Sequence, residues 1–338
     1  MQTGPIAGLV KDTRYDGFLL VRSAEQRAAS NGSRYLDMTL VDRSGEINAK
    51  LWDGAFSPPQ AGSVVRVRGQ VHEYNGRLQL RVERLRQAAP EDNVPLESLV
   101  PCAPEAPEKM LQDVLDTVAS MRSDDLRALL TYLLEDAGDT LLTFPAASKL
   151  HHAERSGLLH HVTSMLRMAK HFADEYPTLD RDLLLSGVIV HDLAKIGELN
   201  ATELGTVSDY TVDGMLIGHL VRGVSRIDAA GKATGCDPEV LLMLEHMVLS
   251  HHGVPEYGSP KPPMFPEAEV LNHLDMLDAR IYEMNAALAR VKPGGFSERL
   301  WSLDRKLYRR ETPPAARADD LLEETDAEPL PEDDPAQN

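Results

Sequence analysis

The feature that most constrains the fold of this chain is a series of histidine and aspartate residues between residues 161 and 275, each within an apolar stretch typical of a helix. Six of these residues are candidate metal ligands: His161, His191, Asp192, His219, His251 and Asp275. They offer only imidazole nitrogen and carboxylate oxygen, a ligand set that suits Mn²⁺, Fe²⁺ or Zn²⁺. Because one ion rarely takes six ligands from a protein, we predict two metal ions that share Asp192, at the point where these segments meet.

The residues around the candidate ligands predict helices. One apolar face is formed by Leu158, Val162, Met165, Leu166, Ala169 and Phe172. Adjacent side chains on a helix point about 100° apart. His191 and Asp192 therefore fit a helix end, where Asp192 can reach between two ions while His191 binds one. We expect an all-α helical bundle over residues 109–310.

The first 89 residues show the pattern of a small β-barrel. Short apolar or alternating runs predict strands near residues 15–23, 34–42, 46–52, 65–68 and 78–82. The Asn75-Gly76 pair before the last run is a strong hairpin signal. Five short strands in this order resemble an OB-fold.

Two further segments have compositions that favour neither helix nor strand. Residues 90–108 contain five prolines, which block long regular elements and indicate a linker. Residues 311–338 contain ten acidic residues, one arginine and no aromatic residue, which predicts a disordered acidic tail.

The sequence around the candidate ligands resembles a known family. The blocks read HHAERSGLLHHVTSMLRMAKHF (residues 151–172), LLLSGVIVHDLAKIGEL (183–199), IGHLVRG (217–223), LEHMVLSHHGVPEYGSP (244–260) and AEVLNHLDMLDAR (268–280). Their order and chemistry resemble the HD superfamily of metal-dependent phosphohydrolases. Together with the barrel-like N-terminal segment, they resemble the YhaM-type 3′→5′ exoribonucleases over residues 1 to 310.

This resemblance implies roles for individual residues. Position in the family motifs makes His161, rather than His160, and Asp275 metal ligands. Either His251 or its neighbour His252 can be the direct ligand; we favour His251, with His252 supporting a ligand or contacting the substrate. The residues with an implied catalytic role are Asp192, Lys195 and His252. The candidate phosphate contacts are His151, His152 and Arg155.

The resemblance also implies two divalent ions, Mn²⁺ before Fe²⁺, Co²⁺ or Zn²⁺, and the release of nucleoside 5′-monophosphates. For Lys195 a plain salt bridge to Asp192, three residues earlier, is as good an interpretation as a contact with a phosphate oxygen. Asp278 lies one helical turn after Asp275 and is expected to orient a neighbouring group.

Charge is distributed unevenly along the chain, and this distribution indicates where a polyanion binds. The net charge is −18, yet residues 1–89 carry 13 basic against 9 acidic residues. Basic and aromatic side chains interspersed along a barrel are typical of contacts to a single-stranded nucleic acid. The candidates are Arg22, Arg34, Lys50, Trp52, Arg66, Arg68, Tyr74 and Arg77, of which Arg66 and Arg68 are expected to be the clearest exposed pair.

Several classes of protein are excluded by composition. No apolar run reaches the roughly 18 residues that a membrane span needs, so no membrane partner is expected. Cys102 and Cys236 lie far apart without CxxC spacing, which argues against a disulfide framework and fits a reducing cytoplasm. The oligomeric state cannot be read from the sequence.

The predicted function is a cytoplasmic, metal-dependent 3′→5′ exoribonuclease on single-stranded RNA. Single-stranded DNA is a further candidate substrate, because nothing visible specifies the 2′-hydroxyl. Three rivals stay open: a phosphohydrolase of small or cyclic nucleotides, a di-iron oxygenase of the inositol oxygenase type, and a non-catalytic RNA-binding adaptor.

Overall fold

The computed structural model describes residues 4–29, 32–52, 57–148 and 150–312. The predicted acidic tail lies, apart from its first two residues, outside the described residues. Two compact units are distinguished, Met1–Tyr282 and Glu283–Asn338. Among the described residues, no helix is both long and apolar enough to cross a membrane.

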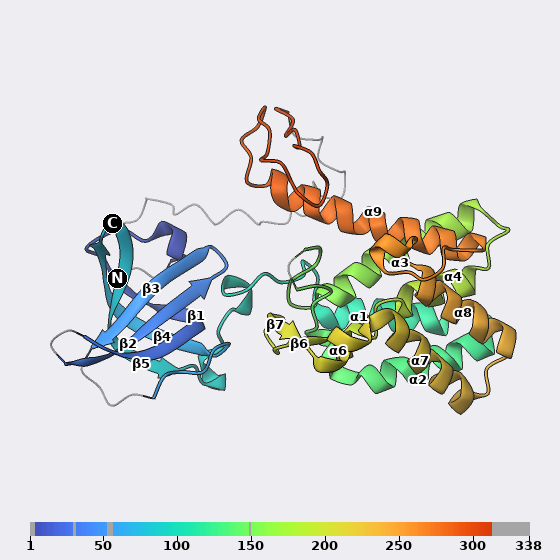
Figure 1. Ribbon diagram of the computed structural model, residues 1–338, viewed down its shortest axis with the longest axis horizontal. Helices are drawn as coiled ribbons and strands as arrows, with labels where there is room; N and C mark the ends of the chain where they lie inside the picture. Colours follow the sequence, from blue (N-terminus) through green and yellow to red (C-terminus); the bar gives the residue numbers. More distant parts are fainter. Residues whose placement is uncertain (1–3, 30–31, 53–56, 149, 313–338) are drawn as a thin grey trace, which may run out of the picture. The chain divides into compact units, whose positions relative to one another are not determined.

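The N-terminal part is a closed five-stranded barrel, as the sequence predicts (Figure 1). Its strands are β1 (Arg14–Ala28), β2 (Arg34–Asp42), β3 (Gly45–Trp52), β4 (Val64–Tyr74) and β5 (Arg77–Gln87). Around the barrel they follow the order β1-β2-β3-β5-β4, and only the β3–β5 pair is parallel. Inward-facing apolar residues alternate with outward polar ones, because successive side chains on a strand point to opposite faces. The largest fully buried side chains of this core are Leu19, Met38, Leu40 and Leu80.

Turns and a bulge fix the register of the last two strands. Asn75 and Gly76 both have positive φ, 52° and 74°, as the predicted tight turn between β4 and β5 requires. The β4–β5 ladder then shifts at Arg68–Gly69. A Cβ atom at Gly69 would lie 2.3 Å from the carbonyl oxygen of Arg81, so only glycine fits at this bulge.

Helices form most of the second part of the chain. They are α1 (Pro107–Ala119), α2 (Asp124–Ala137), α3 (Gly157–Glu175), α4 (Arg181–Val190), α5 (Lys195–Glu198), α6 (Val212–Leu216), α7 (Gly218–Thr234), α8 (Pro238–Ser250) and α9 (Pro266–Leu288). A short hairpin, β6 (Leu199–Ala201) and β7 (Val207–Tyr210), interrupts them, so the expected all-α bundle carries a small sheet.

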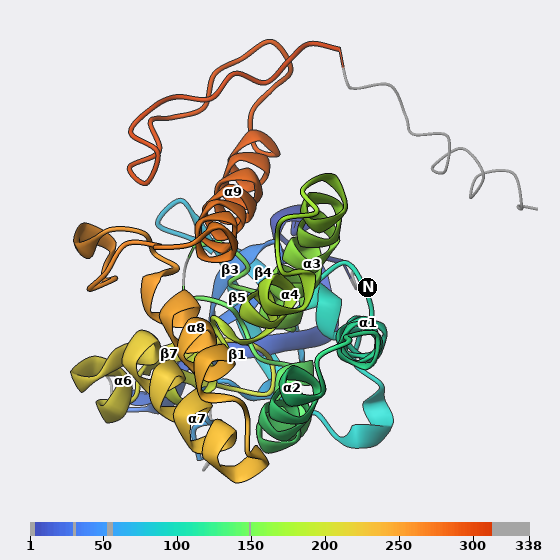
Figure 2. The same ribbon diagram turned by 90° about the vertical axis from the view of Figure 1, so that its right-hand side faces the viewer.

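The most enclosed element is α4, which packs against α2, α3 and α8 (Figure 2). Every residue from Asp182 to Val190 is buried. A helix that is apolar on all sides must lie in the interior, so its C-terminal end delivers the following residues to the centre of the helical core. Those residues are His191 and Asp192.

Two predicted boundaries differ from the structure. The linker ends earlier than expected, because α1 begins at Pro107, where proline suits the first helical turn. The expectation of helices up to residue 310 is wrong: α9 ends at Leu288, and the described residues after it form only isolated bridges, Phe296 to Tyr308 and Leu300 to Arg305. Pro293, Gly294 and Gly295 follow, and none of them favours a helix.

Replacing Gly69 with alanine tests the bulge. We expect the Gly69→Ala variant to lose roughly 1–3 kcal/mol of barrel stability, because the backbone at Arg81 must move to admit the methyl group. Gly8→Ala is the matched control, since no heavy atom of the described residues lies within 4 Å of the position that its Cβ would take. Denaturant unfolding of both variants measures the effect; equal midpoints would contradict the close approach.

Candidate metal centre

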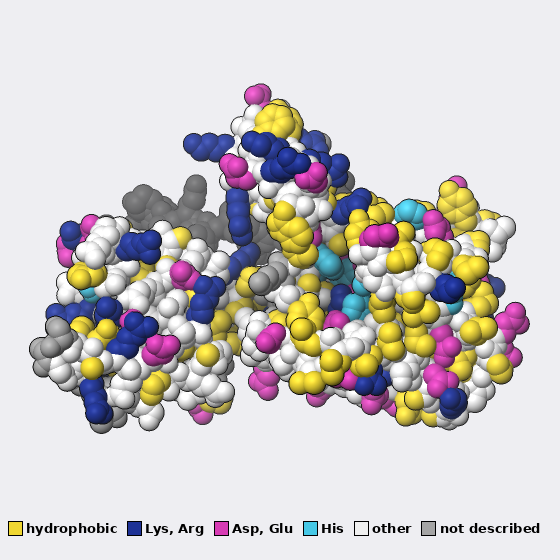
Figure 3. All heavy atoms as spheres, viewed as in Figure 1, with side chains coloured by type: hydrophobic (Ala, Val, Ile, Leu, Met, Phe, Trp, Pro, Cys, Tyr) yellow, Lys and Arg dark blue, Asp and Glu magenta, His cyan; other side chains and the backbone are white. Residues whose placement is uncertain are grey.

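The six predicted ligands converge on one buried centre in the helical part of the chain. His161 lies on α3, His191 and Asp192 directly follow α4, His219 lies in the first turn of α7, His251 ends α8, and Asp275 lies on α9. The side chains of His161, His191 and His251 have no exposed surface. Figure 3 shows histidine side chains gathered on one side of this part of the molecule.

Asp192 lies between two pairs of histidines. Its Oδ2 atom is 3.4 Å from Nε2 of His191 and 3.9 Å from Nε2 of His161. Its Oδ1 atom is 3.5 Å from Nε2 of His219 and 3.7 Å from Nε2 of His251. Each carboxylate oxygen therefore faces two imidazole nitrogens, which is the arrangement that a bridging ligand between two ions needs.

Asp275 completes the first half of this centre. Its Oδ1 atom lies 3.2 Å from Nε2 of His161. Ligand atoms of His191, His251 and Asp275 also lie within 4.8 Å of one another, as do those of His161, His191 and Asp192. The two groups share His191, so they belong to a single site.

The unpaired polar atoms of the centre indicate that it holds cations. Asp192 Oδ1, His219 Nε2 and His251 Nε2 are buried without a hydrogen-bond partner among the described residues. Leaving one such atom unpaired costs about 1–3 kcal/mol. A divalent ion coordinated by all three atoms would satisfy them together, so the residues fit the metal that the ligand chemistry predicts.

Free carbonyl groups at two helix ends orient two of the ligands. Nδ1 of His191 lies 2.9 Å from the carbonyl oxygen of Val188, and Nδ1 of His251 lies 2.7 Å from that of Val248. The last carbonyls of a helix lack a backbone partner, so they can accept from a side chain. Because a carbonyl only accepts, Nδ1 carries the hydrogen, and the lone pair of Nε2 points to the centre.

Carboxylates orient the other two histidines. Asp278 Oδ2 lies 2.8 Å from Nδ1 of His161, the orienting role expected for it. Glu198 Oε2 lies 2.9 Å from Nδ1 of His219. Glu198 was not predicted; its only signal in the sequence is its place three residues after Lys195, where it shares one helical turn with that residue.

The candidate phosphate contact His152 is buried and bonded to other side chains of the protein. It is 2% exposed; its Nε2 is 2.8 Å from Asp278 and its Nδ1 is 3.1 Å from Nδ1 of His160. Both ring nitrogens are thus engaged inside the protein. His160 in turn contacts Glu154 at 2.8 Å, and the Tyr282 hydroxyl donates to the same carboxylate.

The other two candidate phosphate contacts, His151 and Arg155, have different surroundings. The His151 ring is 5.7 Å from that of His161, and burial together with the nearby Lys195 lowers the pKa of His151 to about 3. It is therefore a neutral imidazole next to the centre. Arg155 donates its Nε to the carbonyl oxygen of Glu203, which leaves the rest of its guanidinium for other contacts.

Lys195 forms the salt bridge that the sequence left open as one alternative. Its Nζ atom lies 2.6 Å from Asp192 Oδ2. Burial would raise the pKa of Asp192, but Lys195 and His191 hold it well below its usual range. Burial would likewise lower the pKa of Lys195, and Asp192 raises it. The pair is therefore fully ionised, with a fixed cation beside the centre.

His251 and His252 occupy different positions. His251 is part of the buried cluster, and burial lowers its pKa to about 4. His252 is half-buried at the rim, with its Nδ1 2.8 Å from the carbonyl oxygen of Tyr257. Its ring lies 5.2 Å from that of His219. This geometry favours His251 as ligand and leaves Nε2 of His252 without a bonded partner among the described residues.

The predicted nucleic-acid contacts do not form one patch on the barrel. Trp52 stacks on Tyr35 with ring centroids 4.5 Å apart, and Lys50 Nζ lies 5.3 Å from the Tyr35 ring, on the outer face of β2 and β3. The exposed residues Tyr74 and Arg77 flank the turn between β4 and β5. Arg34 begins β2 and is exposed.

The remaining predicted contacts are tied to acidic partners. Arg22 pairs with Glu46 across the barrel surface. Arg66 and Arg68 both pair with Asp16, at 3.1 Å and 2.6 Å. Arg66 is exposed and Arg68 is half-buried, and the charge of each is partly neutralised by Asp16.

Removing an orienting carboxylate tests the centre without touching a ligand. We expect Asp278→Asn and Glu198→Gln each to weaken Mn²⁺ binding by about 10–100-fold, because the imidazole loses its fixed orientation. Asp174→Asn, an exposed residue on the same helix as His161, is the matched control and should bind as wild type. Direct titration of metal-stripped protein measures this; unchanged affinity in both variants would contradict the ligand geometry.

Comparison with known proteins gives a family match for each part of the chain. Residues 6–88 match the OB-fold nucleic acid binding domain family, and residues 158–280 match the HD domain family. About 25% of the chain also aligns with 94% of the second OB-fold domain of replication protein A from Methanococcus maripaludis, at 19% identity and a TM-score of 0.23.

Two relatives are similar over nearly the whole chain. The 3′-5′ exoribonuclease YhaM of Bacillus licheniformis is 43% identical over 299 residues, which cover 87% of this chain and 93% of that protein. The 3′-5′ exoribonuclease YhaM of Bacillus subtilis is 41% identical over 303 residues, 88% and 95% of the two chains. This chain therefore belongs to the YhaM family of 3′-5′ exoribonucleases.

Proposed function

We propose that this protein is a metal-dependent 3′→5′ exoribonuclease that degrades single-stranded RNA and releases nucleoside 5′-monophosphates. The observation that carries the proposal is the position of Asp192, whose two oxygens each face a pair of imidazole nitrogens. This geometry supports a pair of divalent ions, and an OB-fold barrel in the same chain supports a polymeric substrate. Relatives about as long as this chain are named 3′-5′ exoribonucleases, which supports degradation of the strand from its 3′ end.

The ligands proposed for the two ions are His161, His191, Asp192, His219, His251 and Asp275. Two divalent ions held there would lower the pKa of a water molecule and polarise the scissile phosphate. Mn²⁺ is the proposed ion, because mixed imidazole and carboxylate ligands suit it.

The chain's own residues supply orientation and charge around that centre. The Lys195 ammonium, held against Asp192, offers positive charge where a phosphate oxygen becomes more negative in the transition state. Because the Tyr257 carbonyl fixes the Nδ1 hydrogen of His252, Nε2 of His252 is the atom that contacts the substrate. The neutral His151 ring lies 5.7 Å from that of His161 and offers a further polar contact.

The barrel would bind the RNA strand without regard to sequence. The Tyr35–Trp52 stack presents a π-face to a base, and Lys50 adds a cation for the backbone. We assign residues 1–89 to this domain, 90–108 to the linker, 109–310 to the phosphohydrolase domain and 311–338 to the acidic tail. A cytoplasmic location follows from the substrate.

The activity is tested with single-stranded RNA of about 20 nucleotides, a length of one or two OB-fold sites, labelled at its 5′ end. We expect metal-stripped protein plus Mn²⁺ to produce a ladder that shortens from the 3′ end. Asp192→Ala should remove activity by at least about a hundredfold, since both ions lose a ligand. Asp174→Ala should retain it. A label that stays intact under all these conditions would overturn the proposal.

The stacking platform is tested separately. We expect Trp52→Ala to weaken RNA binding by about 1–3 kcal/mol, the contribution of one stacked base. Tyr132→Ala, an exposed aromatic on α2, is the control and should leave binding unchanged. Fluorescence anisotropy in the presence of EDTA measures binding without cleavage; equal affinities would argue against this face.

A further inference from the structure

A second basic surface lies on the outer side of β1, β4 and β5. Its members form two rows across the three strands, and we call it the arginine face. One row contains Phe18, Arg66 and Arg86; the other contains Asp16, Arg68 and Arg84. Arg84 and Arg86 were not recognised in the sequence, because only strand pairing brings them beside Arg66 and Arg68.

The strand register places like charges opposite each other on the arginine face, which does not favour folding. Arg66 lies directly opposite Arg86, and Arg68 lies directly opposite Arg84, on the antiparallel strands β4 and β5. Like charges directly opposite each other destabilise a sheet. Two such pairs in succession therefore cost stability, and departures from local rules of this kind concentrate at functional sites.

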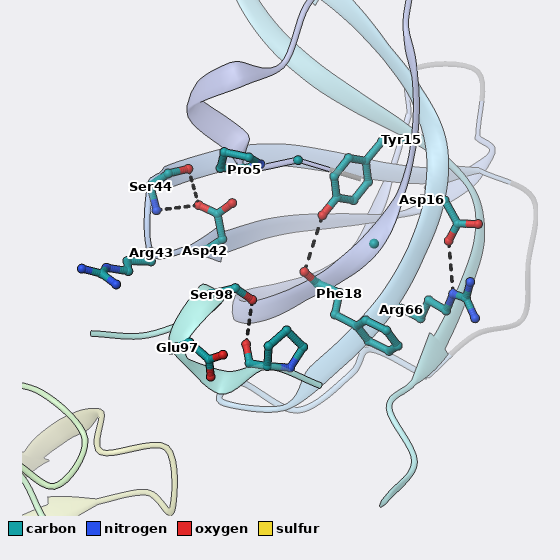
Figure 4. Close-up of a pocket in the computed structure, with 13 residues that line it drawn as sticks. Pro5, Tyr15, Asp16, Phe18, Asp42, Arg43, Ser44, Arg66, Glu97 and Ser98 are labelled. Atoms are coloured by element: carbon teal, nitrogen blue, oxygen red, sulfur yellow. Dashed lines mark hydrogen bonds and ion pairs between the residues drawn. The ribbon is translucent and has the colours of Figure 1, made fainter. Parts of the chain in front are cut away.

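Asp16 and Phe18 hold three of the guanidinium groups in place. Asp16 accepts from Nε of Arg66 at 3.1 Å and from Nη2 of Arg68 at 2.6 Å. The guanidinium carbons of Arg66 and Arg86 lie 5.7 Å and 6.0 Å from the centre of the Phe18 ring, within the range of a cation–π interaction. Figure 4 shows Asp16 joined to Arg66 on one side of Phe18. The forks are thus oriented before any ligand arrives.

The surface keeps an excess of positive charge. Asp16 is shared by two arginines, and Asp92 pairs with Arg86 through two bonds of 2.6 Å. Among the described residues, the side chain of Arg84 makes no hydrogen bond or ion pair. Two carboxylates thus face four guanidinium groups, and Glu83 beside them is oriented to Arg14 instead.

The arginine face is hollowed rather than flat. A cavity of about 390 Å³ is lined by Asp16, Arg66, Arg68, Glu83, Arg84, Leu85 and Arg86. A second cavity of about 730 Å³ shares Asp16 and Arg66 with it and is lined by Tyr15 and Phe18 as well (Figure 4). Side chains two residues apart on one strand are separated by about 6.6 Å, comparable with consecutive phosphates on an extended single strand.

We infer that the arginine face binds the phosphate backbone of single-stranded RNA, as a second contact distinct from the Tyr35–Trp52 platform. The inference rests on the proposed function and adds a binding surface to it. Arginine forks recognise phosphate with paired hydrogen bonds, and Arg84 is the group whose charge is open to a ligand. Because the two surfaces lie on different strand pairs of a closed barrel, only RNA long enough to follow the barrel contacts both.

The test is RNA binding by the full chain in EDTA, at several salt concentrations, with Arg84→Gln. For single strands, each phosphate contact contributes about 0.7 to the slope of log affinity against log salt. We expect this variant to bind an RNA of about 20 nucleotides roughly fivefold more weakly at about 0.1 M salt, with a slope smaller by about 0.7. Arg290→Gln, an exposed arginine outside the barrel, is the control and should match wild type.

The outcomes separate this inference from the proposed function. Wild-type affinity and slope in Arg84→Gln, while Trp52→Ala weakens binding, would overturn the arginine face alone. Tighter RNA binding by Arg84→Gln would overturn it too, because the occupant would then be an acidic competitor such as residues 311–338. RNA that is neither bound nor shortened by wild-type protein would refute the proposed function instead.

Folding of the variant gives an independent readout. Since Arg84→Gln removes one of two opposed like-charge pairs, its unfolding midpoint should equal or exceed that of wild type. Weaker RNA binding together with unreduced stability supports a ligand-binding role. A lower midpoint would indicate that Arg84 stabilises the barrel and would contradict the inference.

Discussion

The carboxylate of Asp192 is the interaction on which the rest of the helical part depends. It is 1% exposed and ionised, and a buried charge without partners would cost several kcal/mol. Lys195 compensates it from one side, and the four surrounding imidazoles leave room for cations on the other. Every residue of α4 from Asp182 to Val190 is buried, and most of them are apolar, so the packing of this helix places the charged side chain of Asp192 in the interior.

Two kinds of hydrogen-bond acceptor orient the imidazoles, and both hold the hydrogen on Nδ1 so that Nε2 faces the centre. At the ends of α4 and α8, carbonyl groups that a helix leaves unpaired accept Nδ1–H of His191 and His251. Elsewhere, carboxylates do so, and Asp278 contacts both His161 and His152. The buried His152 has φ of 49°, a left-handed conformation that is strained for histidine, which ties the turn before α3 to the geometry of the ligand on α3.

How much of this could be predicted depends on how local each signal is. The strands and the Asn75-Gly76 turn are specified by short patterns, and they lie where expected. The ligand candidates were also found from short patterns, and their side chains come close together. Glu198 could not be recognised, because an acidic residue near a helix end is usually solvated, and only the fold brings it to His219. Arg84 and Arg86 could not be recognised for the same reason, because the pairing of residues across strands depends on the tertiary fold.

The distribution of charge explains how an acidic chain can bind RNA. Residues 1–89 have an excess of four positive charges although the whole chain carries −18. The carboxylates of Asp192 and Asp278 are buried at the centre, where divalent ions would offset part of the negative charge of the helical part. Electrostatic attraction of the RNA is therefore a property of the barrel, and hydrolysis is a property of the helical part. A barrel with two separate contact surfaces can hold the strand while the metal centre shortens its 3′ end.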